Sequence, residues 1–445
     1  MKTFRNLLII FTLVFFSSNF LLAQQNITLK DAIAIALNKN VDIVKSENNI
    51  ASYESALKNA YGNLLPSLSL NGGWNWQRVN SIGTNQLDYF GNEQYIPPSQ
   101  TDSRNYSLSV GGNVTLFDGL SNIASINQSK NNLEAARLDL QKQKQDVTLQ
   151  TVNLFVTIIS DNESVKFQDQ DLKYNQGLLD RIKEMYDLKM STLANVYSQQ
   201  VQTANSELTL LQNKNNYEKA KIALLNYLSI DVTAKDSFDI EQKSVVDSSF
   251  YDESLDTLFQ VALNNRKDYQ SEKFKLESSE NQLTSARGGL FPSLSGNYGF
   301  STGAAQLGAL FDRKVYSIGL SLNFPIFSHW STDNSIQSAK IQIENTNEDM
   351  QALERQVRSD VKSAVLDLQT SKKQLQVSND ALTSAKESLS IQRESYNLGA
   401  TTFVDLQQTY RDYVNAENNK IAAEHNYLVK QYELLNALGQ SDIGE

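Results

Sequence analysis

Residues 66–77 read PSLSLNGGWNWQ, and residues 292–300 read PSLSGNYGF. In both stretches large apolar side chains stand at every second position and alternate with Ser, Asn or Gly. This alternation predicts β-strands with one apolar face and one wet face. The pattern returns in residues 106–116 and 316–324, so we expect two β-hairpins, 67–77/106–116 and 293–301/316–324.

The expected strands have the length that a tilted strand needs to cross a bilayer, about 9 to 11 residues. Their polar faces carry small uncharged residues, as a water-filled lumen would. Aromatic residues stand near the strand ends, where membrane strands carry interfacial girdles; they include Trp74, Trp76, Phe117, Phe291, Phe327 and Trp330. A soluble antiparallel sheet packed on a core uses the same alternation and stays open as an alternative.

The chain is an internal duplication. The PSLS motif at Pro66 returns 226 residues later at Pro292, whereas Tyr186 returns 210 residues later at Tyr396. The difference in offset is extra length in the first half, which we assign to an irregular loop over residues 77–104 with several Gly and Pro. A repeat of this length indicates two copies of one large unit. It is too long for the short repeats of a solenoid.

Long helices are predicted between the hairpins. Prolines are absent from Gly119 to Pro292 and after Pro325, and apolar residues recur every seven positions in Val361, Leu368, Leu375, Leu382, Leu389 and Tyr396. Heptads of this kind predict coiled-coil packing. We expect helices over residues 121–186 and 331–396, each about 100 Å long. Shorter helices over 41–61 and 193–228 would lie beside them.

Composition excludes several classes of function. The net charge of −10 opposes nucleic-acid binding. The chain has no Cys and two distant His, and it has no Gly-rich phosphate loop, so we expect no enzyme, no cofactor and no metal site. The absence of Cys also excludes a cysteine-linked lipoprotein.

The N-terminus resembles an export signal. Lys2 and Arg5 precede an apolar run, and Ala23 is a small residue at a plausible cleavage point. A permanent anchor helix is the alternative. We therefore expect a cleaved signal peptide (1–23), a first repeat (24–228), a connector (229–253), a second repeat (254–439) and a tail (440–445).

Barrel closure predicts an oligomer. Four strands cannot close a barrel, and open strand edges are not tolerated in lipid. Two chains would give an eight-stranded barrel, and side chains nearly fill the interior of a barrel of that size. Three chains would give twelve strands and a wet lumen, so we expect a homotrimer.

Together these features resemble the TolC family of outer-membrane efflux proteins. The motifs that carry the resemblance are Leu65-Pro66-Ser67-Leu68, Leu116-Phe117-Asp118-Gly119, Tyr396-Asn397-Leu398-Gly399-Ala400 through Asp405-Leu406, and Leu434-Leu435-Asn436-Ala437-Leu438-Gly439. The resemblance implies mixed α and transmembrane β structure: a homotrimeric twelve-stranded β-barrel in the outer membrane, continued by a coiled-coil α-barrel in the periplasm. It also implies a passive exit duct of an efflux or type I secretion system. The implied partners are a periplasmic adaptor (membrane fusion) protein and an inner-membrane transporter of RND, ABC or MFS type.

The resemblance also implies a gate at the helix–helix turns. Asp405 and Gln408 stand at the family's two acidic constriction positions, Tyr396 matches its gating tyrosine, and Thr401 replaces a basic residue. Tyr186 and Asn195 are the counterparts in the first repeat. Three converging Asp405 carboxylates would raise at least one pKa. The adaptor would dock at the turns, through Leu188, Lys189, Thr192, Leu398, Gly399 and Thr402.

Each of these residues also has a purely structural interpretation. Asp405 can cap a helix, Lys189 can be a solvated charge, and Tyr186 and Tyr396 can fill heptad positions. At the level of the whole chain, a secreted trimeric coiled-coil adhesin explains the heptads but leaves the strands with a wet face unexplained.

Overall fold

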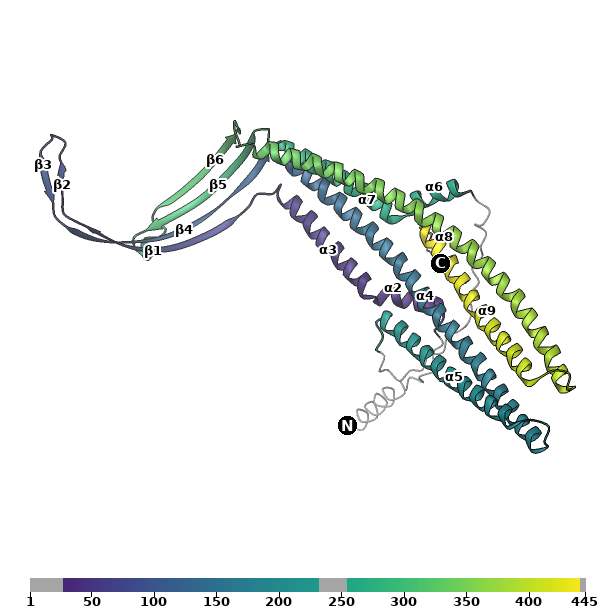
Figure 1. The fold of residues 1–445 in the computed structure, drawn as a ribbon. Coiled ribbons are helices and arrows are strands. Elements are labelled where there is room, and N and C mark those ends of the chain that lie inside the picture. Colours follow the sequence, from purple (N-terminus) through teal and green to yellow (C-terminus); the bar gives the residue numbers. More distant parts are fainter. Residues whose placement is uncertain (1–26, 232–253, 441–445) are drawn as a thin grey trace, which may run out of the picture. The chain divides into compact units, whose positions relative to one another are not determined.

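The computed structural model describes residues 27–231 and 254–440, and Figure 1 labels their helices and strands. The chain forms two compact units. The helical unit comprises residues up to Asn48, Leu138–Gln270 and those from Leu353 on, and the sheet unit comprises Asn49–Arg137 and Ser271–Ala352. The predicted signal peptide, residues 232–253 of the predicted connector and residues 441–445 lie outside the described residues.

The helices occur in two matching sets, in which each helix has the same length as its counterpart. The first set is α2 (Leu29–Lys39), α3 (Val41–Gly62), α4 (Ser121–Asp187) and α5 (Leu193–Tyr227). The second is α6 (Leu255–Asn265), α7 (Lys267–Gly288), α8 (Ser331–Asn397) and α9 (Phe403–Ala437). The two 67-residue helices lie within one residue of the predicted bounds. None of the described helices has the length and apolar character that a membrane span requires.

Two short helices, α2 and α6, were not predicted. Only Asn40 separates α2 from α3, and only Arg266 separates α6 from α7. The start of α2 is set by a capping box between Thr28 and Asp31, in which each side chain bonds the other residue's backbone N–H. These eleven-residue helices are too short for a heptad line to reveal them.

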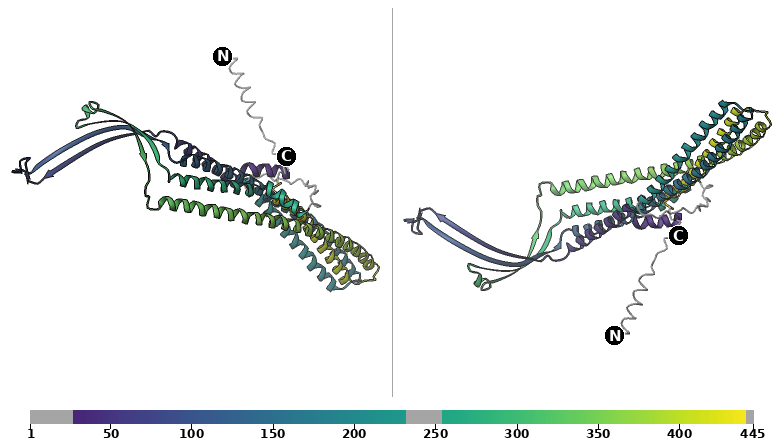
Figure 2. Two further views of the ribbon diagram at one scale, coloured as in Figure 1. Left: turned by 90° about the horizontal axis from the view of Figure 1, so that it is seen from above. Right: turned by 90° about the horizontal axis from the view of Figure 1, so that it is seen from below.

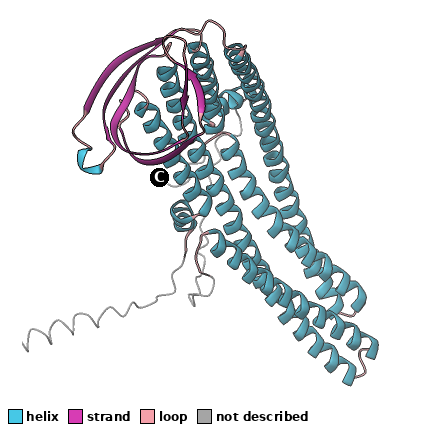
Figure 3. Ribbon diagram, turned by 90° about the vertical axis from the view of Figure 1, so that its left-hand side faces the viewer, coloured by secondary structure: helices cyan, strands magenta, loops and turns pink. Residues whose placement is uncertain are grey.

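Four strands form one antiparallel sheet in the order β1-β4-β5-β6. They are β1 (Ser69–Ser81), β4 (Ser99–Phe117), β5 (Ser293–Ala304) and β6 (Lys314–Asn323), and Figure 3 shows how strongly they curve. The register of the two hairpins repeats residue for residue. Ser69 pairs with Gly111, and its counterpart Ser295, 226 residues later, pairs with Ser321, which lies 210 residues after Gly111.

The strands of the first hairpin run further than predicted, which corrects the expected bounds of 67–77 and 106–116. Residues 77–104 are no irregular loop: pairing of β1 with β4 continues to Ser81 and Ser99. A second small hairpin, β2 (Thr84–Leu87) with β3 (Glu93–Ile96), follows at the end. Apolar alternation stops at Trp76, but pairing continues, and Arg78 and Asp102, which lie directly opposite each other, form a bidentate ion pair with contacts of 2.7 and 2.9 Å. A pattern of apolar residues alone could not reveal this extension.

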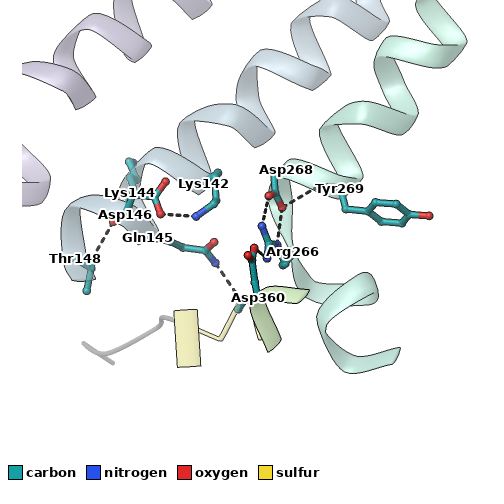
Figure 4. A network of polar contacts seen from close by, with 10 residues as sticks. Lys142, Lys144, Gln145, Asp146, Thr148, Arg266, Asp268, Tyr269 and Asp360 are labelled. Atoms are coloured by element: carbon teal, nitrogen blue, oxygen red, sulfur yellow. Dashed lines mark hydrogen bonds and ion pairs between the residues drawn. The ribbon is translucent and has the colours of Figure 1, made fainter. Parts of the chain in front are cut away.

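A buried ion-pair network fixes the start of α7 in the helical unit (Figure 4). The guanidinium of Arg266 bonds Asp268 at 2.6 Å and Asp360 at 2.7 Å, so it ties the junction of α6 and α7 to α8. Burial alone would raise the pKa of Asp268, but the hydrogen bonds and charge of Arg266 outweigh it and lower that pKa. The counterpart in the first repeat, Asn40, is uncharged and donates to the carbonyl oxygen of Tyr227.

Candidate functional site

The sheet exposes one continuous apolar face. Large side chains at alternate positions of the edge strands are open to solvent in the single chain: Leu68, Leu70, Trp74 and Trp76 on β1 and the segment before it, and Tyr316, Ile318, Leu320, Leu322 and Phe324 on β6 and just after it. Ile318 is 92% exposed, and the four hydrophobic clusters of the described residues contain none of these side chains. Soluble chains rarely expose so large an apolar surface. The alternative of a sheet packed on a core within this chain is therefore wrong.

The opposite face of the sheet carries small polar residues. Asn113 and Asn297 are direct cross-strand partners on β4 and β5, and Ser109 pairs with Ser301 on the same two strands. On the edge strands, Asn71 is the counterpart of Asn297 and Asn323 is the counterpart of Asn113. Ser317 and Ser321 lie on the same face. The sheet thus has the two faces that a channel wall requires, one for lipid and one for water.

In the helical unit, α4, α5, α8 and α9 lie side by side, as both views of Figure 2 show. Two turns of the same geometry join α4 to α5 and α8 to α9. Lys189 and Gly399 adopt left-handed φ angles of 62° and 71° in these turns. The next backbone N–H in each turn donates to a carbonyl five residues back, with distances of 2.7 Å for Met190 and 2.8 Å for Ala400.

The six residues predicted to dock an adaptor all lie in these two turns. Thr192 and Thr402 cap the following helices through their side-chain oxygens. Leu188 and Leu398 are 71% and 75% exposed. Lys189 occupies a backbone position that favours glycine, and its side chain is exposed.

Asp405 belongs to the turn between α8 and α9. Its carboxylate accepts hydrogen bonds from the backbone N–H of Thr402 (3.3 Å) and from the hydroxyls of Thr402 (2.6 Å) and Thr401 (3.2 Å). These bonds, chiefly the one from the Thr402 hydroxyl, lower the pKa of Asp405. In the first repeat Asn195 takes this position, and its side-chain amide donates to Ser191. Within one chain, Asp405 is therefore an exposed member of a capping box.

The remaining predicted gate residues have separate environments. The ring of Tyr396 packs near Phe403 with a centroid distance of 6.0 Å, and burial raises its pKa. Tyr186 is 41% exposed. Gln408 lies on α9, where its side chain donates to Asp412 and accepts from Arg411. Tyr396 thus contributes to helix packing, whereas Tyr186 and Gln408 lie toward solvent.

A buried polar network near the turns was not predicted from the sequence. Its centre is Asn175 on α4, which donates to the hydroxyl of Ser206 (2.9 Å) and accepts from the amide of Gln199 (2.9 Å). Gln199 in turn accepts from the amide of Gln407 on α9 at 3.1 Å. Asn175 and Gln199 are 1% and 0% exposed, so the bonds that join α4 to α5 are enclosed, and the partly buried bond from Gln407 connects them to α9.

A second contact continues this network. The hydroxyl of Tyr410 donates to the carboxylate of Asp171 at 2.7 Å, and burial together with this bond strongly raises the pKa of Tyr410. The Tyr410 ring stacks on Tyr174 at 4.1 Å, and the guanidinium of Arg393 lies 4.4 Å from the Tyr174 ring centroid. Tyr174, Arg393 and Tyr396 line a cavity of about 340 Å³ between α4 and α8.

The duplication held a signal for this network. The small residues of the second repeat's seam include Ser371, Ser378 and Ala385. The positions 210 residues earlier are Asp161, Gln168 and Asn175, which are polar side chains on a heptad line. Polar residues at interior heptad positions predict specific hydrogen-bonded partners.

A sheet with one lipid-type face and one polar face, joined to long helical hairpins, defines a membrane channel extended by coiled coils. A sequence model of the outer membrane efflux protein family matches residues 32–229 and 258–440. The chain belongs to this family. That membership favours the channel over the adhesin interpretation.

Solved structures with similar folds have low sequence identity to this chain. The outer membrane channel CmeC of Campylobacter jejuni matches with a TM-score of 0.78 and 17% identity, covering 93% of this chain and 86% of its own. The outer membrane protein VceC of Vibrio cholerae matches at 0.77 and 16%, covering 92% and 96%. The open state of the MtrE outer membrane channel of Neisseria gonorrhoeae matches at 0.73 and 17%, covering 93% and 89%.

Proposed function

We propose that three copies of this chain form an exit duct through the outer membrane and that a cleaved signal peptide exports each copy. The observation that carries this proposal is the exposed apolar face of a four-stranded sheet that ends in two unpaired edges, β1 and β6. Lipid can cover the face, and neighbouring copies can pair the edges. Three chains then supply twelve strands, enough for a water-filled lumen.

The helices would continue the lumen into the periplasm, where the duct receives substrates. A periplasmic adaptor protein would dock at the exposed turns around Leu188 and Leu398, and an inner-membrane transporter of RND, ABC or MFS type would supply the energy. Membership of the efflux family supports an adaptor and a transporter as classes of partner. The chain itself would conduct passively, without catalysis or a resident cofactor.

The narrow end of the duct would be the turn between α8 and α9. Threefold symmetry would bring three Asp405 side chains toward one axis, and their charges would favour cations over anions. Tyr396 and Thr401 would hold the same turn, the latter through a hydrogen-bonded chain from Gln392 through Thr401 to Asp405 with distances of 2.7 and 3.2 Å. In the first repeat, Tyr186 and Asn195 would occupy the matching positions without the acidic ring.

Planar-bilayer recording of the purified full-length protein tests the proposal. We expect a trimeric mass by native mass spectrometry and a cation-selective conductance. Asp405→Ala should weaken cation selectivity and leave the trimer intact, and Asp256→Ala, at an exposed position of α6 away from this turn, serves as a charge-matched control. A monomer without conductance would refute the duct, whereas a conducting trimer whose selectivity ignores Asp405 would refute only the gate.

A further inference from the structure

The outward face of the sheet changes its chemistry at one end. On three of the four strands, a cation lies two residues from an aromatic residue, on the same face and on the side toward this end of the sheet. The pairs are Trp76 with Arg78 on β1, Tyr106 with Arg104 on β4, and Tyr316 with Lys314 on β6. Because side chains two apart share a face of a strand, each cation lies directly beyond the apolar band.

The strand register groups Arg78 with Arg104, whereas Lys314 lies on the second hairpin opposite Thr302, whose other partner is Leu108. Trp76 and Arg104 are direct cross-strand partners, and Arg78 is opposite Asp102 on the next outward pair. The Arg78 guanidinium lies 5.3 Å from the centroid of the Trp76 ring, so cation and aromatic belong to one surface. Tyr316 pairs with Phe300, and Lys314 with Thr302, so the second hairpin repeats the order of aromatic residue and cation.

The opposite end of the sheet has no such cations on its outward positions. There the apolar band ends in Leu68, Leu116, Leu294 and Phe324, and the first charged residue after β4 is Asp118. The asymmetry argues against a general need for charge at a membrane boundary. It indicates that one of the two headgroup layers carries negative charge that this end recognises.

We propose that Arg78, Arg104 and Lys314 bind the phosphates of anionic lipid headgroups in the leaflet that borders this end of the sheet, an inference that rests on the proposed membrane barrel. Arginine presents paired N–H donors that match a phosphate group. Asp102 already occupies both donor groups of Arg78 that face it. No salt bridge to Arg104 or Lys314 is found among the described residues, so these two cations carry most of the attraction.

Tryptophan fluorescence provides a local readout, because Trp76 touches the site and Trp74 lies two residues away on the same face. In a Trp330→Phe background, these two are the only tryptophans that remain. The protein is reconstituted into phosphatidylcholine vesicles that contain either brominated phosphatidic acid or brominated phosphatidylcholine. The ratio of quenching by the two lipids measures the preference of the site for an anionic phosphate headgroup over a zwitterionic one.

We expect brominated phosphatidic acid to quench more strongly, with a preference of about fivefold for each participating cation. Arg104→Gln should reduce the preference by about that factor, and Arg104→Lys should retain part of it. Asp102→Asn should raise the preference, because it releases Arg78 from its carboxylate. Arg287→Gln, which removes a cation from α7 near the other end of the sheet, should leave the ratio unchanged.

Two contrary results have separate meanings. Equal quenching by both lipids, unaltered by Arg104→Gln and Asp102→Asn, would overturn this inference and leave the barrel standing. Absence of quenching by either brominated lipid would show that the sheet does not contact acyl chains, and would overturn the proposed barrel together with this inference. Inorganic phosphate at the same total concentration should not change the ratio; loss of the preference would mean that the site takes free phosphate in place of the lipid headgroup, and would overturn this inference.

Discussion

At position 189 the two halves of the duplication have different residues in the same turn. The second repeat has Gly399 where the backbone turns left-handed, whereas the first repeat forces Lys189 into the same geometry with a φ of 62°. A residue with a Cβ pays about 1 kcal/mol or more for this conformation. Lys189 therefore stores local strain at a turn that we assign to adaptor docking.

Exchanging the two residues tests this reading. Lys189→Gly should raise the thermal midpoint of the helical circular-dichroism signal in detergent, corresponding to a gain of about 1 kcal/mol in unfolding free energy. Gly399→Ala should lower it by a similar amount. The nearby exposed change Lys183→Gly, in a helix interior, should destabilise. If Lys189→Gly also destabilises, the lysine side chain makes a contact worth more than the strain.

Asp405 gives the α8–α9 turn a dependence on pH. Its pKa is lowered in the folded chain, so its stabilisation is present above the unfolded-state value near 4 and is lost as the pH falls through the lower folded-state value. Hydrogen exchange over residues 398–408 should therefore accelerate in acid beyond the intrinsic trend. Asp405→Asn should remove this acid dependence, whereas Asp412→Asn should keep it. A wild-type turn with flat, pH-independent protection would contradict the capping role.

At the scale of helices, the buried network makes α4, α5 and α9 depend on one another. Asn175→Ala would leave the hydroxyl of Ser206 without its side-chain donor, and would leave the Gln199 amide only its 3.1 Å bond to the backbone carbonyl of residue 175, at a cost of about 1–3 kcal/mol in this enclosed site. Gln176→Ala, on the exposed side of the same helix turn, should change stability by less than about 0.5 kcal/mol.

Hydrogen exchange resolved by segment measures this effect. We expect Asn175→Ala to deprotect residues near 199 and 206 on α5 as well as those around 175 on α4. Deprotection confined to α4 would mean that the network does not couple the helices. Protection equal to that of Gln176→Ala would mean that water replaces the lost hydrogen bonds.

The contrast between well-predicted and missed elements has a physical cause. The long helices α4 and α8 follow from heptads and from the absence of proline, because these patterns are local and extend over many turns. The extension of β1 past Trp76 contains polar cross-strand partners such as Arg78 with Asp102, which the apolar pattern of a single strand does not reveal. The network at Asn175 depends on three helices meeting, so its partners Gln199 and Gln407 could not be identified before the fold was known.

The same limit applies to the proposed gate. Sequence placed Asp405 at the start of a helix and offered two roles for it, a cap or a constriction. The hydrogen bonds from Thr402 establish the cap. The constriction depends on an axis that passes through three chains, so it stays a prediction for the assembled molecule.

For the whole molecule, the duplication predicts how neighbouring copies pair. Within one chain, β4 and β5 join the first hairpin to the second, with Asn113 opposite Asn297. The counterparts of these strands are β6 and β1, the two edges of the sheet. If the joint between chains repeats the joint within the chain, Asn323 of one copy lies opposite Asn71 of the next, because these residues are offset from Asn113 and Asn297 by 210 and 226 positions. Ser321 would likewise oppose Gly73.

Disulfide trapping can check this register directly, because the native chain contains no cysteine. Asn71→Cys with Asn323→Cys should give dimers and trimers linked by disulfide under mild oxidation, since direct cross-strand partners bring their Cβ atoms within bonding range. Asn75→Cys with Asn323→Cys lies on the same face but four residues out of register, and should crosslink far less. Equal yields from the two variants would show that the edges do not pair in the duplicated register. Monomers alone from both, in a preparation that conducts, would mean that β1 and β6 do not close the barrel against each other.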